Sequence, residues 1–388
     1  MNNFRFFKNV LSHFIDIFII FIFIKPKNFL IKDQSRNKIV GIIKIDGLGD
    51  YIIWKNAIQS LIKFYKDNDF KVVGIFESSS AELANIDEDF DEIIPINKFK
   101  FYSIFYRLRL FKMISQKGMS EIISMTFSNI IGSPHNSISY ASNAKKISTI
   151  SQYVSNNLLV GALRKVSNAI VFNNVIEVDT SNSIHEYVRS KNFIESLKIP
   201  LKVTNQNDFL NTDDLPSIIN TYKNYILIVS DASSEEKCWP INKYLELSIE
   251  LIRLNFNVVW AGQQNFTKEQ EAILKKNNII NLTKKTTIRE FVSLIKTSDL
   301  LVCNDSFPIH VAAFCGVRSI CLYWGGVYRR FLPYPENSDR NIRNPEIQPS
   351  EFFFEDNLQN KEKIGNKIIA NIAVSDILNL VLSKDTNL

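Results

Sequence analysis

The chain has 388 residues, the length of two average domains, and 45% of them are hydrophobic while 22% are charged. This composition excludes a disordered or collagen-like chain. The net charge of +6 is concentrated at the start, because residues 1–38 hold seven basic and two acidic side chains and so contribute +5. The body is nearly neutral, which argues against the broad basic footprint of a nucleic-acid-binding domain.

An apolar stretch lies inside this basic leader. Residues 14–24 are all Phe or Ile except Asp16, and eleven residues are too few to cross a bilayer comfortably. No small-residue cleavage site of a signal peptide follows. Besides a marginal membrane span, two interpretations remain open: a segment packed against the body, or an interfacial anchor flanked by cations that meet anionic head groups. Those cations are Arg5, Lys8, Lys25 and Lys27.

We expect residues 1–37 to form a basic hydrophobic leader that precedes the two domains and is a candidate membrane-surface anchor. Deletion of residues 1–36 should then release the protein from membranes without destroying its fold. The four cysteines all lie in the second half without a Cys-x-x-Cys pair, and the chain has only four histidines. This pattern is typical of a reducing compartment and predicts neither a disulfide framework nor a metal site.

The first half of the chain alternates strand and helix patterns. Buried strands are expected over residues 38–45, 71–76, 92–96 and 121–125, and a helix is expected over residues 51–65. Pro95 weakens the third of these strands. Strand, helix and strand at this pitch predict a parallel sheet with helices on both faces.

The same alternation restarts in the second half. Its expected strands are residues 225–229, 257–261, 300–303 and 319–323, and its expected helices are residues 241–254, 288–297 and 308–315. A polar stretch over residues 203–216 marks the join. We therefore predict an α/β protein with two Rossmann-like domains facing a cleft, residues 38–205 and residues 206–388, the second with a terminal helix. Ligands of such sheets bind outside the carboxyl ends of the strands.

The first strand leads into Lys44-Ile-Asp-Gly-Leu-Gly-Asp50. Its glycines let the backbone approach a ligand, but the third glycine of a dinucleotide-binding fingerprint is missing. Asp50 at the helix start is either a plain N-cap or a general base, since an ionised carboxylate accepts a proton from an attacking hydroxyl.

Two further loops also lie between a strand and a helix. The loop Ser230–Pro240 carries Lys237, which can meet a phosphate as a point charge, although a solvated loop would look the same. In Asn304-Asp-Ser-Phe-Pro-Ile-His310, Asp305 or Ser306 can cap the following helix, and a lone histidine in such a place is usually structural.

Together and in this order, the motifs resemble those of glycosyltransferase family nine, the heptosyltransferases of bacterial lipopolysaccharide assembly. The match covers residues 38–382 and leaves the leader outside. Its blocks are Lys44–Asp50, Ala144-Lys-Lys-Ile147, His185-Glu-Tyr-Val188, Lys237-Cys-Trp-Pro240, Asn281-Leu-Thr-Lys-Lys-Thr-Thr287 and Asn304–His310.

The resemblance implies a GT-B fold with an acceptor-binding first domain and a nucleotide-sugar-binding second domain. It also implies inverting transfer of a heptose from ADP-heptose to a lipopolysaccharide core or related surface glycan, without a catalytic metal or other cofactor. Asp50 matches the catalytic base. The donor-binding residues implied are Lys237 at the diphosphate, Thr286 and Thr287 in the phosphate region, Asp305 at the donor sugar, and Ser306 and His310 in the same loop.

Three positions depart from the family pattern, because Phe307, Lys284 and Ser148 stand where the family has glycine. Changes at the donor loops favour one alternative, the same fold with a different nucleotide-sugar donor. A non-catalytic glycan- or nucleotide-binding relative is a second alternative, although Asp50, Lys237 and Asp305 are all present. An oxidoreductase is a distant third, because the glycine fingerprint is incomplete.

Residues 98–117 bear on the acceptor, since they contain six basic residues, six Phe or Tyr and no acid. The aromatics would be core in a helix, or would suit a phosphorylated glycolipid at a membrane surface. The acceptor-binding candidates are Gly49, Lys98, Lys100, Arg107 and Arg109. We expect a cytoplasmic protein, peripheral on the inner face of the bacterial cytoplasmic membrane, with no nucleic-acid partner.

Overall fold

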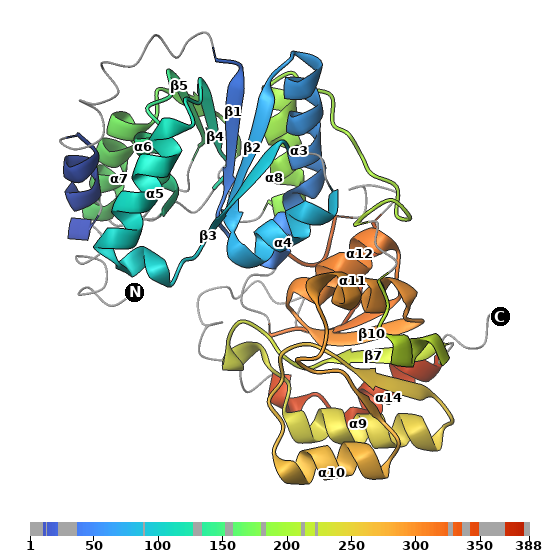
Figure 1. The fold of residues 1–388 in the computed structure, drawn as a ribbon. Helices are drawn as coiled ribbons and strands as arrows, with labels where there is room; N and C mark the ends of the chain where they lie inside the picture. The colour runs from blue at the N-terminus through green and yellow to red at the C-terminus, as the bar shows by residue number, and fades with distance from the viewer. Residues whose placement is uncertain are drawn as a thin grey trace. The chain divides into compact units, whose positions relative to one another are not determined.

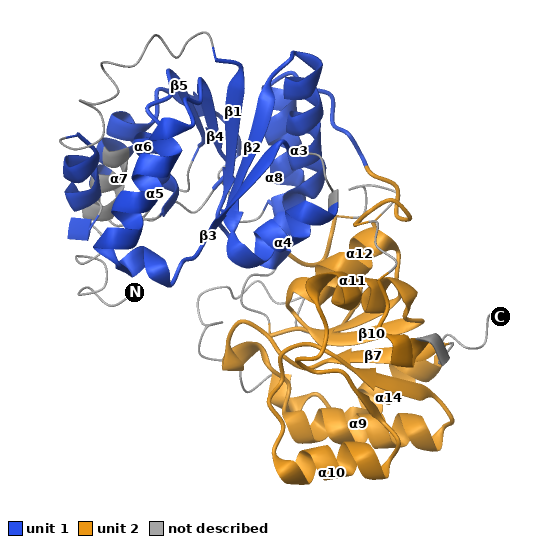
Figure 2. Cartoon of the chain, in the orientation of Figure 1, with its two compact units in different colours: residues 1–203 blue, residues 204–388 orange. Residues whose placement is uncertain are grey.

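Two compact units make up the chain, residues 1–203 and residues 204–388 (Figure 2). Each unit is built on one six-stranded parallel sheet (Figure 1). The prediction of an α/β protein with two parallel sheets is therefore confirmed. The computed structural model describes residues 11, 12, 14–21, 37–87, 90–126, 134–151, 158–179, 184–210, 214–221, 224–324, 329–335, 342–348 and 369–383.

The sheet of unit 1 has the strand order β3-β2-β1-β4-β5-β6. This is the order of a Rossmann sheet, in which the direction of construction reverses between β1 and β4. Val40 of β1 pairs with Val72 of β2 on one side and with Glu121 of β4 on the other. The strands are β1 Ile39–Lys44, β2 Lys71–Glu77, β3 Glu92–Ile96, β4 Glu121–Ser124, β5 Lys146–Ile150 and β6 Asn174–Ile176.

Helices cover both faces of this sheet (Figure 1). One face lies under α3 and α8, where Trp54 packs against Phe193 with ring centroids 5.8 Å apart. The other lies under α5, α6, α7 and the helical residues near the N-terminus, whose Ile20 is fully buried with Ile43 of β1. The helices are α3 Leu48–Asp67, α4 Ser78–Asp87, the short η3 Lys100–Tyr102, α5 Ile104–Gln116, α6 Pro134–Ala141, α7 Leu158–Val171 and α8 Glu186–Ser196.

Residues 14–21 pack into unit 1, as the interpretation of a segment packed against the body predicts, whereas the expectation that the leader can be deleted without loss of the fold is wrong. Asp16 is 1% exposed and forms an ion pair with Arg107 of α5, with 2.5 Å between Oδ1 and Nη1. Ser137 of α6 donates to the other oxygen of Asp16 at 2.9 Å. Deletion of residues 1–36 would leave the buried Arg107 without its partner and remove Ile20 from the core. The first ten residues and residues 22–36 lie outside the described residues.

Unit 2 repeats the same topology, with the order β12-β11-β10-β7-β8-β9 and its reversal between β7 and β10. One face lies under α9, α10 and α14, and α11 and α12 lie on the other (Figure 1). The elements are η4 Ser217–Thr221, β7 Tyr225–Val229, η5 Glu235–Lys237, α9 Ile241–Arg253, β8 Asn257–Trp260, α10 Lys268–Lys276, β9 Ile280–Asn281, α11 Ile288–Thr297, β10 Leu300–Asn304, α12 Phe307–Cys315, β11 Ser319–Leu322, β12 Glu346–Gln348 and α14 Val374–Leu382.

Each strand predicted from the sequence is present within a residue or two. Pro95 is tolerated because β3 lies at the sheet edge, where one side of the strand needs no hydrogen bonds. The stretch expected to join the domains is partly core: Phe209 is fully buried and stacks on Phe314 at 4.8 Å. Across the described ranges, no helix combines the length and the apolar character needed to cross a membrane.

Replacing Asp16 with alanine should lower the free energy of unfolding by about 3–5 kcal/mol, because the Arg107 charge stays buried without a partner. Urea-induced unfolding measures the change. Asp67→Ala is the matched control, since Asp67 pairs with Lys63 at the surface and its loss should cost less than about 1 kcal/mol.

A double variant distinguishes the cost of an unpaired buried charge from the cost of lost packing. Replacing Asp16 and Arg107 together with Leu and Met should recover most of the lost stability, because no buried charge then remains. A loss below about 1 kcal/mol in Asp16→Ala alone would contradict a structural role for this ion pair.

Candidate functional site

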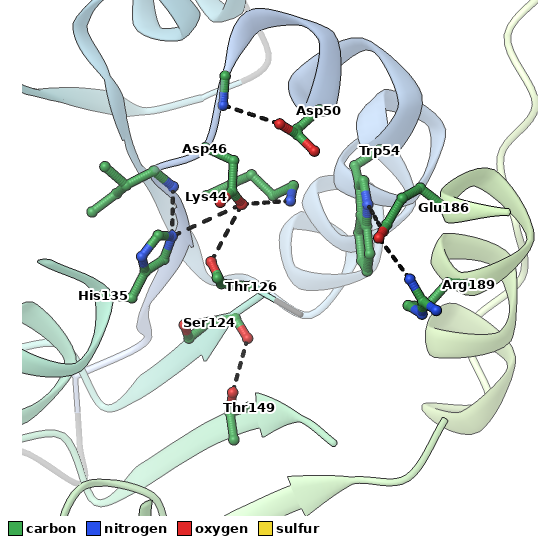
Figure 3. A network of polar contacts seen from close by, with 12 residues as sticks. Lys44, Asp46, Asp50, Trp54, Ser124, Thr126, His135, Thr149, Glu186 and Arg189 are labelled. Atoms are coloured by element: carbon green, nitrogen blue, oxygen red, sulfur yellow. Dashed lines mark hydrogen bonds and ion pairs between the residues drawn. The ribbon is translucent and has the colours of Figure 1, made fainter. Parts of the chain in front are cut away.

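The first candidate site lies at the carboxyl end of β1, next to the point where the strand order reverses. β1 ends at Lys44 and α3 begins at Leu48, so only three residues make the connection. Thr126, which follows β4, donates to Oδ2 of Asp46 at 3.4 Å (Figure 3). The loops after the two neighbouring strands therefore meet where a Rossmann sheet binds its ligands.

Lys44 is a buried cation at the centre of this site (Figure 3). Its side chain is 4% exposed, its ammonium lies 2.7 Å from Oδ2 of Asp46, and it faces the Trp54 ring at 4.8 Å. Burial alone would lower the pKa of Lys44, but the carboxylates of Asp46, Asp50 and Glu186 outweigh burial and raise it. The lysine is charged at neutral pH.

Asp46 is held ionised. Burial opposes its charge, but Lys44, His135 and Lys98 lower the pKa of Asp46 to about 2. Nε2 of His135 accepts a hydrogen bond from the backbone N–H of Ile45 at 2.9 Å, and burial lowers the pKa of this histidine to about 4. His135 is therefore neutral at pH 7 with its proton on Nδ1.

The pKa of Asp50 is shifted in the opposite direction to that of Asp46. It is the third residue of α3, not an N-cap, and its Oδ2 accepts from the backbone N–H of Gly47 at 3.2 Å. Burial raises the pKa of Asp50 to about 6, Asp46 and Glu186 also raise it, and Lys44 lowers it. The β1–α3 loop and the first turn of α3 thus present two carboxylates of different proton affinity, an arrangement that suits acid–base chemistry.

Glu186 connects this site to α8. Its Oε2 accepts from the indole N–H of Trp54 at 3.2 Å, and its Oε1 pairs with Arg189 at 2.6 Å (Figure 3). His185 caps α8 by accepting from the N–H of Tyr187 at 3.0 Å. These contacts explain the His-Glu block structurally. The histidine caps α8, and the glutamate links α8 to α3 through the hydrogen bond from Trp54.

The five predicted acceptor-binding residues differ in how close they lie to the β1–α3 loop and in how exposed they are. Lys98 donates to the backbone oxygen of Asp46 at 3.1 Å, so its ammonium reaches the β1–α3 loop, and Gly49 lies in the first turn of α3. Lys100 and Arg109 are exposed. Arg107 is 7% exposed and paired with Asp16, so its guanidinium is not available to an acceptor.

The second candidate site lies at the reversal point of unit 2, where Asn304 joins two loops. The side-chain oxygen of Asn304 accepts from the N–H of Trp239 at 3.1 Å and from the hydroxyl of Tyr244 at 2.9 Å. Its amide donates to the backbone oxygen of Ser230 at 2.6 Å. One fully buried side chain thus aligns the loop after β7 with the loop after β10.

This alignment brings Lys237 and Asp305 together. Their Nζ and Oδ2 atoms are 3.8 Å apart, and Asp305 is 4% exposed. The indole N–H of Trp324 donates to the same Oδ2 at 3.0 Å, while the Lys237 ammonium lies 5.2 Å from the Trp324 ring. Burial raises the pKa of Asp305, and Lys237 and the Trp324 hydrogen bond oppose it.

Two of the predicted donor-binding residues stand at helix starts. Ser306 is the N-cap residue of α12, and Thr287 caps α11 by accepting from the N–H of Glu290 at 3.2 Å. Thr286 is half-buried. His310 is 5% exposed, with Nδ1 2.8 Å from the hydroxyl of Tyr334, and therefore supports α12 from inside. In the part of the chain that the structure describes, no three His, Cys, Asp or Glu side chains are grouped to hold a metal ion.

The three departures from glycine leave the loops intact. Lys284 has φ = 59°, the left-handed conformation that glycine adopts freely, and its N–H still donates to Gly262 at 2.8 Å. Phe307 opens α12, with its ring 6.1 Å from that of Phe291. Ser148 lies inside β5.

Sequence reasoning missed several of these residues. Asp46 lies four residues before Asp50 in the same sequence block, and a second acid there was the signal that could have found it. Asn304 is the first residue of the block Asn304–His310, but the sequence alone assigned it no role. His135 had no such signal, because it is 90 residues from the Ile45 N–H that it meets.

Solved structures share this architecture. Escherichia coli heptosyltransferase WaaC with ADP-2-deoxy-2-fluoro heptose aligns with a TM-score of 0.61 at 14% identity, over 89% of this chain and 99% of that one. E. coli ADP-heptose lipopolysaccharide heptosyltransferase II aligns with a TM-score of 0.60 at 17% identity, over 90% and 99%. The fold is thus that of the two-domain GT-B-like glycosyltransferases.

Sequence comparison gives the family. The model of glycosyltransferase family 9 (heptosyltransferase) matches residues 169–361, about half of the chain. Lipooligosaccharide heptosyltransferase 2 of Campylobacter jejuni is 24% identical over 158 residues, and lipopolysaccharide core heptosyltransferase OpsX of Haemophilus influenzae is 30% identical over 115 residues. These alignments cover 39% and 28% of this chain, and the chain spans about half or less of these relatives' lengths, 47% and 33%. The chain belongs to glycosyltransferase family 9.

Replacing Asn304 with alanine should destabilise unit 2 by about 2–4 kcal/mol, because the Tyr244 hydroxyl and the Trp239 N–H lose a buried acceptor. Nucleotide binding should weaken as well, since Lys237 and Asp305 lose their alignment. Thermal unfolding and calorimetric titration with ADP measure the two effects. Asn207→Ala, at an exposed position, is the control, and equal results for both variants would contradict the role of Asn304.

Proposed function

We propose that the protein is an inverting glycosyltransferase that moves a heptose from ADP-heptose to a lipopolysaccharide core or related surface-glycan acceptor. The observation that carries the proposal is the chemistry at the two reversal points: a carboxylate of raised pKa in unit 1, and a lysine beside an acid in unit 2. Structures of E. coli heptosyltransferase WaaC hold ADP-2-deoxy-2-fluoro heptose and ADP, which supports this donor. The site of action is the cytoplasmic face of the bacterial membrane.

Asp50 is the proposed base. Its carboxylate accepts the proton of the acceptor hydroxyl while that oxygen attacks the anomeric carbon and the bond to the departing phosphate oxygen breaks. With a pKa of about 6, roughly nine-tenths of Asp50 is ionised at pH 7, and its affinity for a proton exceeds that of an ordinary aspartate. Asp46 has a pKa of about 2 and is the weaker base.

The donor groups lie in unit 2. Lys237 meets the diphosphate, whose negative charge grows as it leaves, and the first N–H groups of α12 supply further donors. Asp305 accepts hydrogen bonds from hydroxyls of the donor sugar. Ser306 lies in the same loop as Asp305, and Thr286 lies in the loop between β9 and α11. Thr287 and His310 hold the starts of α11 and α12 in shape.

The acceptor groups lie in unit 1. Gly49 and Lys98 lie at the β1–α3 loop beside Asp50, where they contact the reacting part of the acceptor. Lys100 and Arg109 are exposed cations suited to its phosphorylated portion.

A second candidate keeps this chemistry and changes the donor sugar. The observation that favours it is Trp324, whose indole N–H already occupies Oδ2 of Asp305. A thermal-shift panel of nucleotide sugars on the full chain separates the two candidates. Stabilisation by ADP-heptose above all others supports the first, and preference for another nucleotide sugar supports the second. Stabilisation by none would contradict both.

Replacing Asp50 with asparagine should reduce the rate of transfer by about 10²–10⁴-fold, because the amide cannot accept the proton. The dissociation constant of ADP-heptose should stay unchanged, since the donor groups belong to unit 2. Asp67→Asn, on the exposed end of α3, is the matched control and should transfer normally. Unaltered turnover in Asp50→Asn would remove Asp50 from the role of base.

The acid limb of the pH–rate profile should fall about tenfold per pH unit below about pH 6, where Asp50 becomes protonated. Asp46→Asn should move this limb to lower pH, because the Asp46 charge raises the pKa of Asp50 while Lys44 continues to lower it. The measurement is kcat/KM from pH 4 to 8 for both proteins. A limb that stays in place or moves to higher pH would contradict the coupling of the two carboxylates.

A further inference from the structure

The N-terminal helical residues of unit 1 have two apolar faces. Asp16, Ile19 and Ile20 point into the domain. The opposite stripe consists of four exposed apolar side chains spaced four, three and three residues apart, which places them along one side of a helix. They are Leu11, Ile15, Phe18 and Phe21, with exposed fractions of 64, 38, 62 and 62%. A helix that met only water on this side would carry polar residues there.

The outer side of α5 continues this apolar surface. Phe105 is 81% exposed and Met113 is 38% exposed, and just before α5 Phe99 and Tyr102 are 87% and 72% exposed. Four of the five exposed phenylalanines among the described residues lie in these two segments.

The two segments are neighbours. Nη1 of Arg107 on α5 donates to Ser12 at 2.7 Å and to Asp16 at 2.5 Å. Both helices belong to the layer that covers one face of the sheet, so their outer sides point away from that sheet together (Figure 1).

This surface carries positive charge, which indicates an anionic partner. Lys100, Arg109 and Lys112 are exposed, and no described residue forms an ion pair with them. Residues 98–117 contain no acid, and the one acid of residues 11–21 is the buried Asp16. In a two-fold dimer built on this surface, cations would meet cations. Aromatic side chains among unpaired cations fit the head-group region of an anionic bilayer.

We propose that the outer side of residues 11–21, η3 and α5 is a docking surface for an anionic lipid bilayer. Phe18, Phe21 and Phe105 enter the head-group boundary, and Arg109 and Lys112 meet the lipid phosphates. The surface rests on the proposed function only in that a lipid-linked acceptor would lie at the same bilayer.

The Asp16–Arg107 pair decides which side of the helix faces outward. Rotation of the helix would move a carboxylate toward lipid and leave the Arg107 guanidinium buried without its partner, and both changes are costly. Ile20 and Phe18 are both apolar, so hydrophobicity alone does not distinguish the two sides.

Flotation of the full chain with vesicles of phosphatidylcholine, with and without phosphatidylglycerol, tests the surface. The protein should float with the anionic vesicles only. Phe18→Ser with Phe105→Ser should weaken binding at least about tenfold, and Arg109→Gln with Lys112→Gln should weaken it by a similar factor at low salt. The matched controls lie in unit 2, where Ile218→Ser with Leu254→Ser and Lys275→Gln with Lys276→Gln should leave binding unchanged.

Two further measurements keep this proposal separate from the proposed function. ADP-heptose binding and transfer to a water-soluble acceptor should be unaltered in the Phe18/Phe105 variant, which also shows that it is folded. Full vesicle binding by this variant, or equal flotation with neutral vesicles, would overturn the docking surface while leaving transfer intact. Light scattering that shows a dimer dissociating in this variant, with vesicle binding unchanged, would assign the surface to a second copy.

Discussion

The buried ammonium of Lys44 is the constraint on which the candidate site depends. A cation with a 4% exposed side chain needs anionic partners, and these come from three places: Asp46 at 2.7 Å, Asp50 on α3 and Glu186 on α8. The strand, the loop and two helices are therefore tied to one charge. This charge holds the loop in place, and the carboxylates of Asp46 in the loop and Asp50 in α3 have pKa values of about 2 and about 6.

In unit 2 the loops at the reversal point are held together by different residues. Its sheet has the same order, so the loops after β7 and β10 meet as those after β1 and β4 do. Asn304 supplies the fixed geometry, and Lys237 and Asp305 supply charge of both signs. The two reversal points thus differ in chemistry: unit 1 has a carboxylate whose pKa is raised, and unit 2 has a lysine beside a buried acid. This division supports the proposed transfer reaction.

Much of the fold could be predicted from the sequence, because the runs Ile39–Lys44 and Tyr225–Val229 are buried strands bounded by turn residues. β5 and β6 were not predicted, since KISTI and NVI are short and partly polar. The loops carrying Asp50, Lys237 and Asp305 were located, but the partners that set their properties were not. His135 and Glu186 reach the site only through tertiary packing. Asp16 looked like an interruption of an apolar leader, and its buried partner Arg107 lies 91 residues away.

The most direct test of this account is a carbon-13 NMR titration of the aspartate carboxyl groups in the full chain, with Asp46→Asn and Asp50→Asn used for assignment. The account predicts that the resonance lost in Asp50→Asn titrates near pH 6, while the one lost in Asp46→Asn remains that of an ionised carboxylate down to about pH 3. An Asp50 carboxyl that titrates near pH 4, as an isolated aspartate does, would contradict it.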